Sequence, residues 1–531
     1  MHVEPKNIRR QVIPRWRQLH RTRPEELKST VKADENWQNQ LKALREREVV
    51  KAASTWRAKP TLGNASEFVA AALATEHEQQ AAGAARQIVA AESNATNAAR
   101  RVARRLLNGF KFAGLKPDST LLIPESSRDY IYGELHRLKR RIAIYPPNAL
   151  VYVEIARLYS SIGQMSQAES AIEKAVILAP QSRFVLRAAS RLFIHQNDPR
   201  RAHDLLRRND VTRHDPWLLS AEIALSAVAD RSSKFVSSAR ELLNLDRLAP
   251  LQISELAAAL GTTEIAHGAH RSGTKLMRRS LIDPTDNSVA QARWVAQEIG
   301  SEFSVDYLSV QGTFEARAED AHSRGADPNK VLEHCTLWWE DEPFSARPAT
   351  LGSYTAAARL FDYDLALKFA DAGLIASPGS TLLANNKVVA LAKLGRLSDA
   401  RTELTRIKEK LGSLNPVIRA TEGLVYFREG NVDAGRKCYE QAIREANEMH
   451  NTEVAIRARA HLLEERVVAG IFDRADAIAE LDRDIAELDK DFRTTKNQKL
   501  ISLWGGLVKH LRAITENTDS NSSHRDTARS K

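Results

Sequence analysis

Apolar residues recur at helical spacing in the stretch NALVYVEIARLYSSIGQMSQAESAIEKAVILAP, which begins at Asn148. The first stripe falls on one face of a helix and consists of Tyr152, Ile155, Ala156 and Tyr159. Gly163 interrupts it where a tight turn is expected, and a second stripe follows at Ala168, Ile172 and Ala175. Pro180 ends the second stripe. The pattern predicts two antiparallel helices joined by a short turn.

The two-helix pattern recurs in four further stretches, which start at Arg183, Arg347, Thr381 and Pro416. In the last three of these the predicted turn positions are Phe361, Gly395 and Gly430, which lie 34 and 35 residues apart. A repeat of this length is typical of stacked helical units. We therefore predict five repeat units between about 149 and 446. Two intervening units, which end near Pro250 and Pro284, match the pattern only in part.

The unit resembles the tetratricopeptide repeat, in which small residues such as Ala156 and Ala168 lie where the two helices cross closely. The resemblance implies an all-α fold, a superhelical solenoid of stacked helix pairs. It also implies that the first helix of each unit lines a concave groove, which holds an extended peptide or a helix of a protein partner.

The remaining sequence divides around two repeat arrays. We predict six segments: a basic helical extension with an extended arm (1–110), a first array (111–300), an irregular helical spacer (301–346), a second array (347–450), C-terminal capping helices (451–515) and a disordered tail (516–531).

Positive charge is concentrated at the N-terminus. Residues 1–110 contain 20 basic and 11 acidic residues and so carry +9 of the net charge of +11. The opening arm contains one tryptophan among six arginines: Arg9, Arg10, Arg15, Trp16, Arg17, Arg21 and Arg23. Pro5, Pro14 and Pro24 prevent the arm from forming one helix. Such an arm can neutralise nucleic-acid phosphates, or it can dock on an acidic protein surface.

No sequence motif indicates catalysis. The chain has no phosphate-binding loop, dinucleotide fingerprint, zinc-protease motif or nucleophile elbow. Its two cysteines, Cys335 and Cys438, form neither a CxxC pair nor a Cys/His cluster. We expect a non-enzymatic protein that has no catalytic, cofactor or metal site. Its low cysteine content and lack of an apolar spanning segment favour the cytoplasm.

The second array has a basic residue two positions before each predicted turn: Arg359, Lys393 and Arg428. Stacking would align these cations with one another, and Asn386 would lie on the same helix-face region. Such a ladder suits acidic side chains or a C-terminal carboxylate of a partner. Lysine and asparagine are, however, common at these two positions across the family whether or not they bind a ligand.

We predict a scaffold or adaptor that binds a protein, with an acidic peptide or helix as a candidate ligand. The alternative is a nucleic-acid-associated regulatory subunit, which would bind through residues 1–110. A place in a larger bacterial assembly, such as a defence system, is compatible with both, and no residue selects it.

Overall fold

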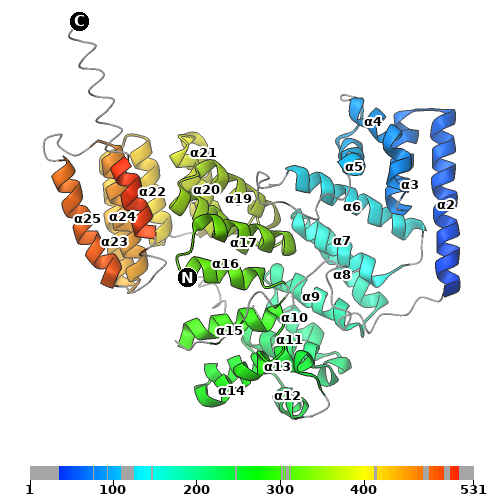
Figure 1. Cartoon of the computed structure of the whole chain (residues 1–531), viewed down its shortest axis with the longest axis horizontal. Helices are drawn as coiled ribbons and strands as arrows, with labels where there is room; N and C mark the ends of the chain where they lie inside the picture. Colours follow the sequence, from blue (N-terminus) through cyan, green and yellow to red (C-terminus); the bar gives the residue numbers. More distant parts are fainter. Residues whose placement is uncertain are drawn as a thin grey trace, which may run out of the picture. The chain divides into compact units, whose positions relative to one another are not determined.

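The computed structural model describes residues 35–75, 77–91, 94–108, 125–144, 147–244, 248–299, 312–411, 415–470, 477–494 and 503–513, with four isolated positions (303, 305, 310 and 501). Every regular element in these residues is a helix (Figure 1). The chain divides into two compact units. The first unit comprises Met1–Ala316 and Asp341–Ser345, and the second comprises Arg317–Glu340 and Ala346–Lys531. The basic arm, Arg9 to Arg23, and the tail 516–531 lie outside the described residues.

The first unit is built from consecutive antiparallel helices (Figure 1). They are α2 (Glu35–Ala58), α3 (Leu62–Thr75), η3 (Glu78–Ala81), α4 (Ala82–Ala90), α5 (Asn97–Asn108), α6 (Glu125–Ile144), α7 (Ala149–Ser161), α8 (Met165–Leu178), α9 (Arg183–His195), α10 (Pro199–Arg207), η4 (Asp210–His214), α11 (Pro216–Val228), α12 (Val236–Leu243), α13 (Pro250–Ala266), α14 (His270–Ser280) and α15 (Asp286–Ile299). From α7 onward they form successive pairs, α7 with α8 up to α13 with α14. The two partly matching stretches are thus also helix pairs.

The N-terminal helices α2 to α5 have a core of their own. Nine of its sixteen buried residues are alanine, and the larger side chains are Val49, Phe68, Val69, Leu73, Ile88, Val102 and Leu106. Alanine lets helices approach closely but buries little apolar area per residue. Helix α6 packs against α3 and α5 on one side and α7 on the other, and so connects this core to the paired helices.

The second unit contains a further series of helix pairs. Its elements are α17 (Pro328–Asp341), α18 (Ala346–Thr355) with a π-helical turn η5 (Ala356–Leu360), α19 (Tyr363–Ala376), α20 (Thr381–Lys393), α21 (Leu397–Leu411), α22 (Pro416–Arg428), α23 (Val432–Glu448), α24 (Thr452–Val468), α25 (Ala477–Thr494) and helical residues 503–513. The first helices of successive pairs, α18, α20, α22 and α24, pack against one another in order.

The turns between paired helices adopt a left-handed backbone at one residue each. In the second array this residue is Phe361, Gly395 or Gly430, with φ values of 56°, 75° and 82°. These are the three predicted turn positions. Glycine adopts this conformation without strain. A bulky residue such as Phe361 rarely adopts it, because its side chain disfavours a positive φ. Phe361 is also the residue that ends the π-helical turn η5.

The partly matching units keep the same turn geometry, one with aspartate (Asp230) and one with glycine (Gly268) at the turn. Between the paired helices α7 to α14, the left-handed residues are Gly163, Asn197, Asp230 and Gly268. Asparagine and aspartate tolerate this backbone better than other non-glycine residues. The turn at Asn197 or Asp230 is therefore formed by a residue that a search for glycine overlooks.

Small residues at helix crossings are required by the packing in the second array. A Cβ atom added to Gly435 would lie 2.5 Å from Cδ2 of Phe427, and one added to Gly423 would lie 2.8 Å from Cδ2 of Tyr439. Each glycine of this pair of helices thus accepts an aromatic ring from the other helix. Any larger residue would separate α22 from α23.

The predicted spacer contains two helices, α16 (Phe314–Ser323) and α17, joined by a left-handed turn at Gly325. The division between the two units also falls within this segment, at Ala316 and again at Asp341–Ser345. Trp338 on α17 is fully buried beneath the guanidinium of Arg347, which lies 5.0 Å from the ring centroid. This tryptophan is a packing residue.

Candidate functional site

Lys393 and Arg428, two of the predicted groove cations, meet a pair of carboxylates from α24. Lys393 Nζ lies 2.5 Å from Oε1 of Glu464 and 2.7 Å from Oε1 of Glu465. Arg428 Nε lies 2.8 Å from Oε2 of Glu465. The side chain of Lys393 is 6% exposed and the two glutamates are 2% and 1% exposed, whereas Arg428 keeps 22% of its side chain exposed. The four groups form one buried charge cluster.

The repeat geometry explains why these charges meet. Lys393 and Arg428 are the thirteenth residues of α20 and α22, and Glu464 is the thirteenth residue of α24. Corresponding positions on successive first helices align when the pairs stack. Helix C-termini favour cations, which suits Lys393 and Arg428 as the last residues of their helices. Because α24 is longer, it places Glu464 before its end and can present an acid there.

The cluster is electrostatically matched. Burial raises the pKa of Glu464, but the Lys393 ammonium and a hydrogen bond from His461 outweigh it and leave the pKa well below its usual range. Burial lowers the pKa of Lys393, and the carboxylates of Glu464 and Glu465 more than restore it. Burial also raises the pKa of the neighbouring Tyr363 to about 12, so its phenol is neutral at physiological pH. Lys393 and Glu464 are therefore both charged in the folded protein.

The other two predicted groove residues bond to the helix pair before their own. Arg359 Nη2 donates to the carbonyl oxygens of Ala326, at 2.6 Å, and Gly325, at 3.2 Å. Asn386 Nδ2 donates to the carbonyl oxygen of Thr350 and to Oγ of Ser353. Arg359 thus holds the turn after α16, and Asn386 ties α20 to α18. Both contacts join a helix to the helices that precede its own pair.

We call the surface that carries Tyr354, Lys393, Arg428 and Glu464 the inner face of the second unit. Its first and last helices approach each other, because the Arg457 guanidinium on α24 lies 4.9 Å from the ring centroid of Tyr354 on α18. An outside carboxylate at Lys393 would have to displace Glu464 or Glu465. The acidic ligand therefore stays a prediction. In the structure, Glu464 and Glu465 occupy the position at Lys393 that a carboxylate of the ligand would take.

The helix formed by residues 503–513 packs on this inner face. Its buried residues are Leu503, Trp504, Leu507 and Leu511. They share one apolar cluster with Ile456, Ala460, Leu463 and Val467 of α24 and with Ile485 and Leu488 of α25. Tyr354, Ala358 and Phe361 from α18 and η5 contribute to the same cluster. His510 stacks on the ring of Phe361 with centroids 3.9 Å apart, and its Nε2 lies 3.8 Å from Oε1 of Glu464.

Sequence reasoning missed Glu464, Glu465 and His510 as members of the site. One signal was present: Arg359, Lys393, Arg428 and Glu464 follow one another at intervals of 34, 35 and 36 residues. Continuing the repeat interval past Arg428 leads to the acidic pair. The repeat interval does not predict the contact between His510 and Phe361, because residues 503–513 follow the last helix pair and belong to no repeat.

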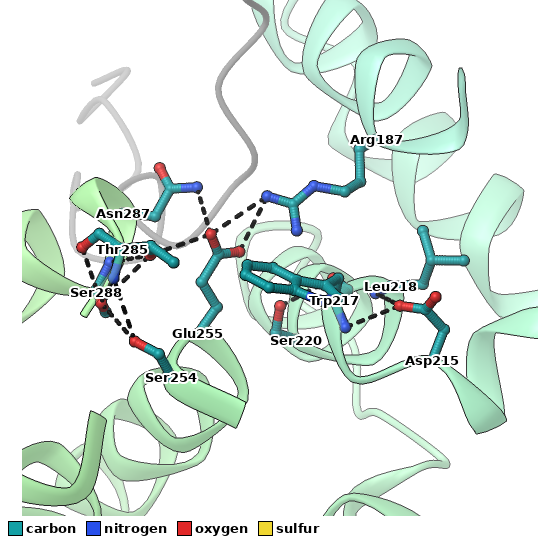
Figure 2. A network of polar contacts seen from close by, with 10 residues as sticks. All are labelled: Arg187, Asp215, Trp217, Leu218, Ser220, Ser254, Glu255, Thr285, Asn287 and Ser288. Atoms are coloured by element: carbon teal, nitrogen blue, oxygen red, sulfur yellow. Dashed lines mark hydrogen bonds and ion pairs between the residues drawn. The ribbon is translucent and has the colours of Figure 1, made fainter. Parts of the chain in front are cut away.

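The first unit has a related cluster around Glu255, shown in Figure 2. Arg187 Nη2 on α9 lies 3.1 Å from Oε2 of Glu255 on α13, and Asn287 and Thr285 donate to Oε1 of the same carboxylate at 3.0 and 3.2 Å. The Arg187 guanidinium lies 5.2 Å from the ring centroid of Trp217 on α11, the helix between them. Here, too, a cation pairs with an acid two helix pairs further along the chain.

The sequence model of the tetratricopeptide repeat matches residues 149–182, which form α7 and α8. This part of the chain is similar to a tetratricopeptide repeat. The predicted resemblance is thereby confirmed, and the all-α, helical-repeat fold is confirmed by the paired helices of both units. Tetratricopeptide repeats form protein-interaction scaffolds in general.

Solved helical-repeat structures align with the chain at low identity. Naa15/Naa10 bound to HypK-THB is 11% identical with a TM-score of 0.27 and covers 91% of this chain and 80% of that one. Yeast Tom70 is 11% identical with a TM-score of 0.25, and the alignment covers 74% of this chain and 93% of that one. The APC/C hetero-tetramer Cut9-Hcn1 is 10% identical with a TM-score of 0.30, and the alignment covers 89% of this chain and 95% of that one. The search of curated proteins found no match.

The described part of the chain contains no group of three or more His, Cys, Asp or Glu residues placed to hold a metal ion. Within the same residues, no helix has the length and apolar content needed to cross a bilayer.

Proposed function

We propose that this protein is a non-enzymatic scaffold that holds a helical or extended segment of a partner protein on the first helices of its repeats. The observation that carries the proposal is the occupancy of the inner face of the second unit. That face already accepts an apolar helix, residues 503–513, next to a cluster of matched charges. A surface that binds a helix of its own chain has the shape and chemistry to bind one from another protein.

The acidic-ligand hypothesis is part of this proposal. Arg428 is the most exposed member of the charge cluster, and a guanidinium can bind a second carboxylate through its remaining donors. A partner carboxylate would then either join Glu465 at Arg428 or replace it. Lys393 holds two carboxylates already and is the less accessible cation.

The proposal is tested by site-specific photocrosslinking with the full chain in native lysate. A crosslinking amino acid replaces Val389, which lies one helical turn before Lys393 on α20. The matched control replaces Glu409, an exposed residue of the second helix of the same pair, α21. We expect one defined protein to crosslink from position 389 and not from 409. Crosslinking from 409 alone would contradict binding on the inner face.

A second comparison separates this function from the nucleic-acid alternative. The experiment is repeated after nuclease treatment and with the six arm arginines, Arg9 to Arg23, replaced by serine. The scaffold proposal predicts that the crosslink survives both changes. Loss of the crosslink with nuclease, moderate salt or the neutral arm would favour the nucleic-acid-associated subunit, because phosphate contacts weaken steeply with salt.

A further inference from the structure

The helix of residues 503–513 contains two adjacent glycines, Gly505 and Gly506. Each glycine in a helix interior weakens the helix about 5-fold relative to alanine. Packing does not require them: a Cβ atom added to either would meet no atom within 4 Å. By contrast, the glycines at helix crossings in this unit, Gly423 and Gly435, have no room for a Cβ atom. The glycine pair makes the helix weak without improving its fit.

The docked side of this helix is apolar and small. Four residues are buried against the inner face and α25, at 2% (Leu503), 3% (Trp504), 2% (Leu507) and 0% (Leu511) exposure. On the other side Gly505, Lys509, Arg512 and Ala513 are exposed. Residues 503–513 alone would be too few for a stable isolated helix in water, least of all with two glycines. The helix therefore depends on its packing against the inner face and α25 for its structure.

From these two observations we infer that residues 503–513 are an exchangeable internal ligand of the inner face, which a partner helix displaces. This inference rests on the proposed function and specifies its ligand. The partner presents an amphipathic helix with large apolar residues spaced as in Leu503, Trp504, Leu507 and Leu511. Docking of the internal helix lowers the apparent affinity of the partner by the fraction of molecules in which the face is open.

The charge cluster sets the polar part of this recognition. His510 reaches the inner face between the Phe361 ring and the Glu464 carboxylate. A partner helix gains the same contacts if it carries an aromatic or cationic side chain one turn after its third apolar residue. Glu464 remains paired with Lys393 whichever helix is bound, so exchange does not leave a buried carboxylate alone.

The test uses the full chain and a fluorescein-labelled synthetic peptide with the sequence of residues 501–513. Fluorescence anisotropy measures its affinity for four chains: wild type, Leu507→Asp, Lys509→Asp and the double variant Gly505→Ala/Gly506→Ala. Leu507→Asp removes a buried anchor from the internal helix and leaves the inner face unchanged. Lys509→Asp alters an exposed residue of the same helix and serves as its control.

We expect Leu507→Asp to bind the peptide at least about 10-fold more tightly than wild type, because the face is open. Lys509→Asp should bind it like wild type. The alanine pair should bind it about 5- to 25-fold more weakly, because its internal helix is more stable. A peptide with aspartate in place of the leucine at 507 should bind none of the four chains.

Equal peptide affinity for wild type, Leu507→Asp and the alanine pair would overturn the inference, because residues 503–513 would then be a permanent cap. If Leu507→Asp fails to fold, the alanine pair decides the question alone. These outcomes are separate from those of the scaffold proposal. A partner that crosslinks at position 389 while the peptide binds no variant would leave the scaffold function in place and exclude the internal ligand.

Discussion

Each unit contains a buried cation paired with a carboxylate from a helix two helix pairs further along the chain, but the surroundings of the two pairs differ. In the first unit Arg187 on α9 pairs with Glu255 on α13, and in the second Lys393 on α20 pairs with Glu464 and Glu465 on α24. Each pair spans two helix pairs, with sequence separations of 68 in the first unit and 71 and 72 in the second. Stacking thus brings charges from alternate repeats together in both units.

The two clusters differ in what completes them. Thr285 and Asn287, neutral donors from the beginning of the next helix, satisfy Glu255. Glu464 instead contacts the ring of His461 on its own helix, and the ring of His510, in the helix of residues 503–513, lies close to the same carboxylate. The first cluster is closed by the repeat array itself. The second is covered by a segment beyond the last helix pair, and this difference underlies the proposed exchange of that segment for a partner helix.

The largest expected effect comes from removing the cation of the second cluster. Lys393→Met should destabilise the second unit by about 3–5 kcal/mol, because two buried carboxylates lose their ammonium partner. The free energy of unfolding, measured with denaturant, checks this value. The control is Lys387→Met on the same helix, whose pair with Asp371 is partly exposed, and which should cost at most about 1 kcal/mol. Equal losses would contradict the account of a buried cluster.

A smaller effect is expected in the first cluster. Arg187→Met should destabilise the first unit by about 1.5–3 kcal/mol, because Glu255 keeps hydrogen bonds from Thr285 and Asn287. Chemical denaturation of the two variants in parallel sharpens the comparison. A loss at Arg187 as large as that at Lys393 would show that the neutral donors do not compensate for the cation.

The smallest effect concerns pH. Burial lowers the pKa of His510 from its ordinary value of 6.5, Lys393 and Arg428 lower it further, and Glu464 opposes them. Docking is thus at full strength above about pH 6.5. It weakens as the pH falls below that value, because the undocked histidine takes up its proton first. The 501–513 peptide should bind the Leu507→Asp chain a few-fold more weakly at pH 5.5 than at pH 7.5.

A peptide with glutamine in place of this histidine provides the control, and its affinity should change less over the same pH range. Tighter binding of the histidine peptide at pH 5.5 would contradict the account. It would mean that attraction between the protonated ring and Glu464 outweighs burial against Phe361 and repulsion by Lys393 and Arg428.

Sequence spacing predicted the helix pairs well, because each unit has small and apolar residues at the same positions and these residues pack its two helices together. The interval between Phe361, Gly395 and Gly430 located three turns that the backbone forms at those residues. The interval placed Lys393 and Arg428 in one row and, when continued, leads to Glu464, but it could not show that these side chains come into contact. That contact depends on how sharply successive pairs turn, which is set by many side-chain volumes together. The helix of residues 503–513 belongs to no repeat, so its docking site was not encoded in any interval.

The most direct test of the central claim is amide hydrogen exchange of the full chain, which compares residues 503–513 with helix α24. We predict that residues 503–513 exchange at least about 10-fold faster than α24, and that Gly505→Ala/Gly506→Ala slows their exchange while leaving α24 unchanged. Equal protection of the two helices in the wild-type chain would contradict the claim that the inner face opens on its own.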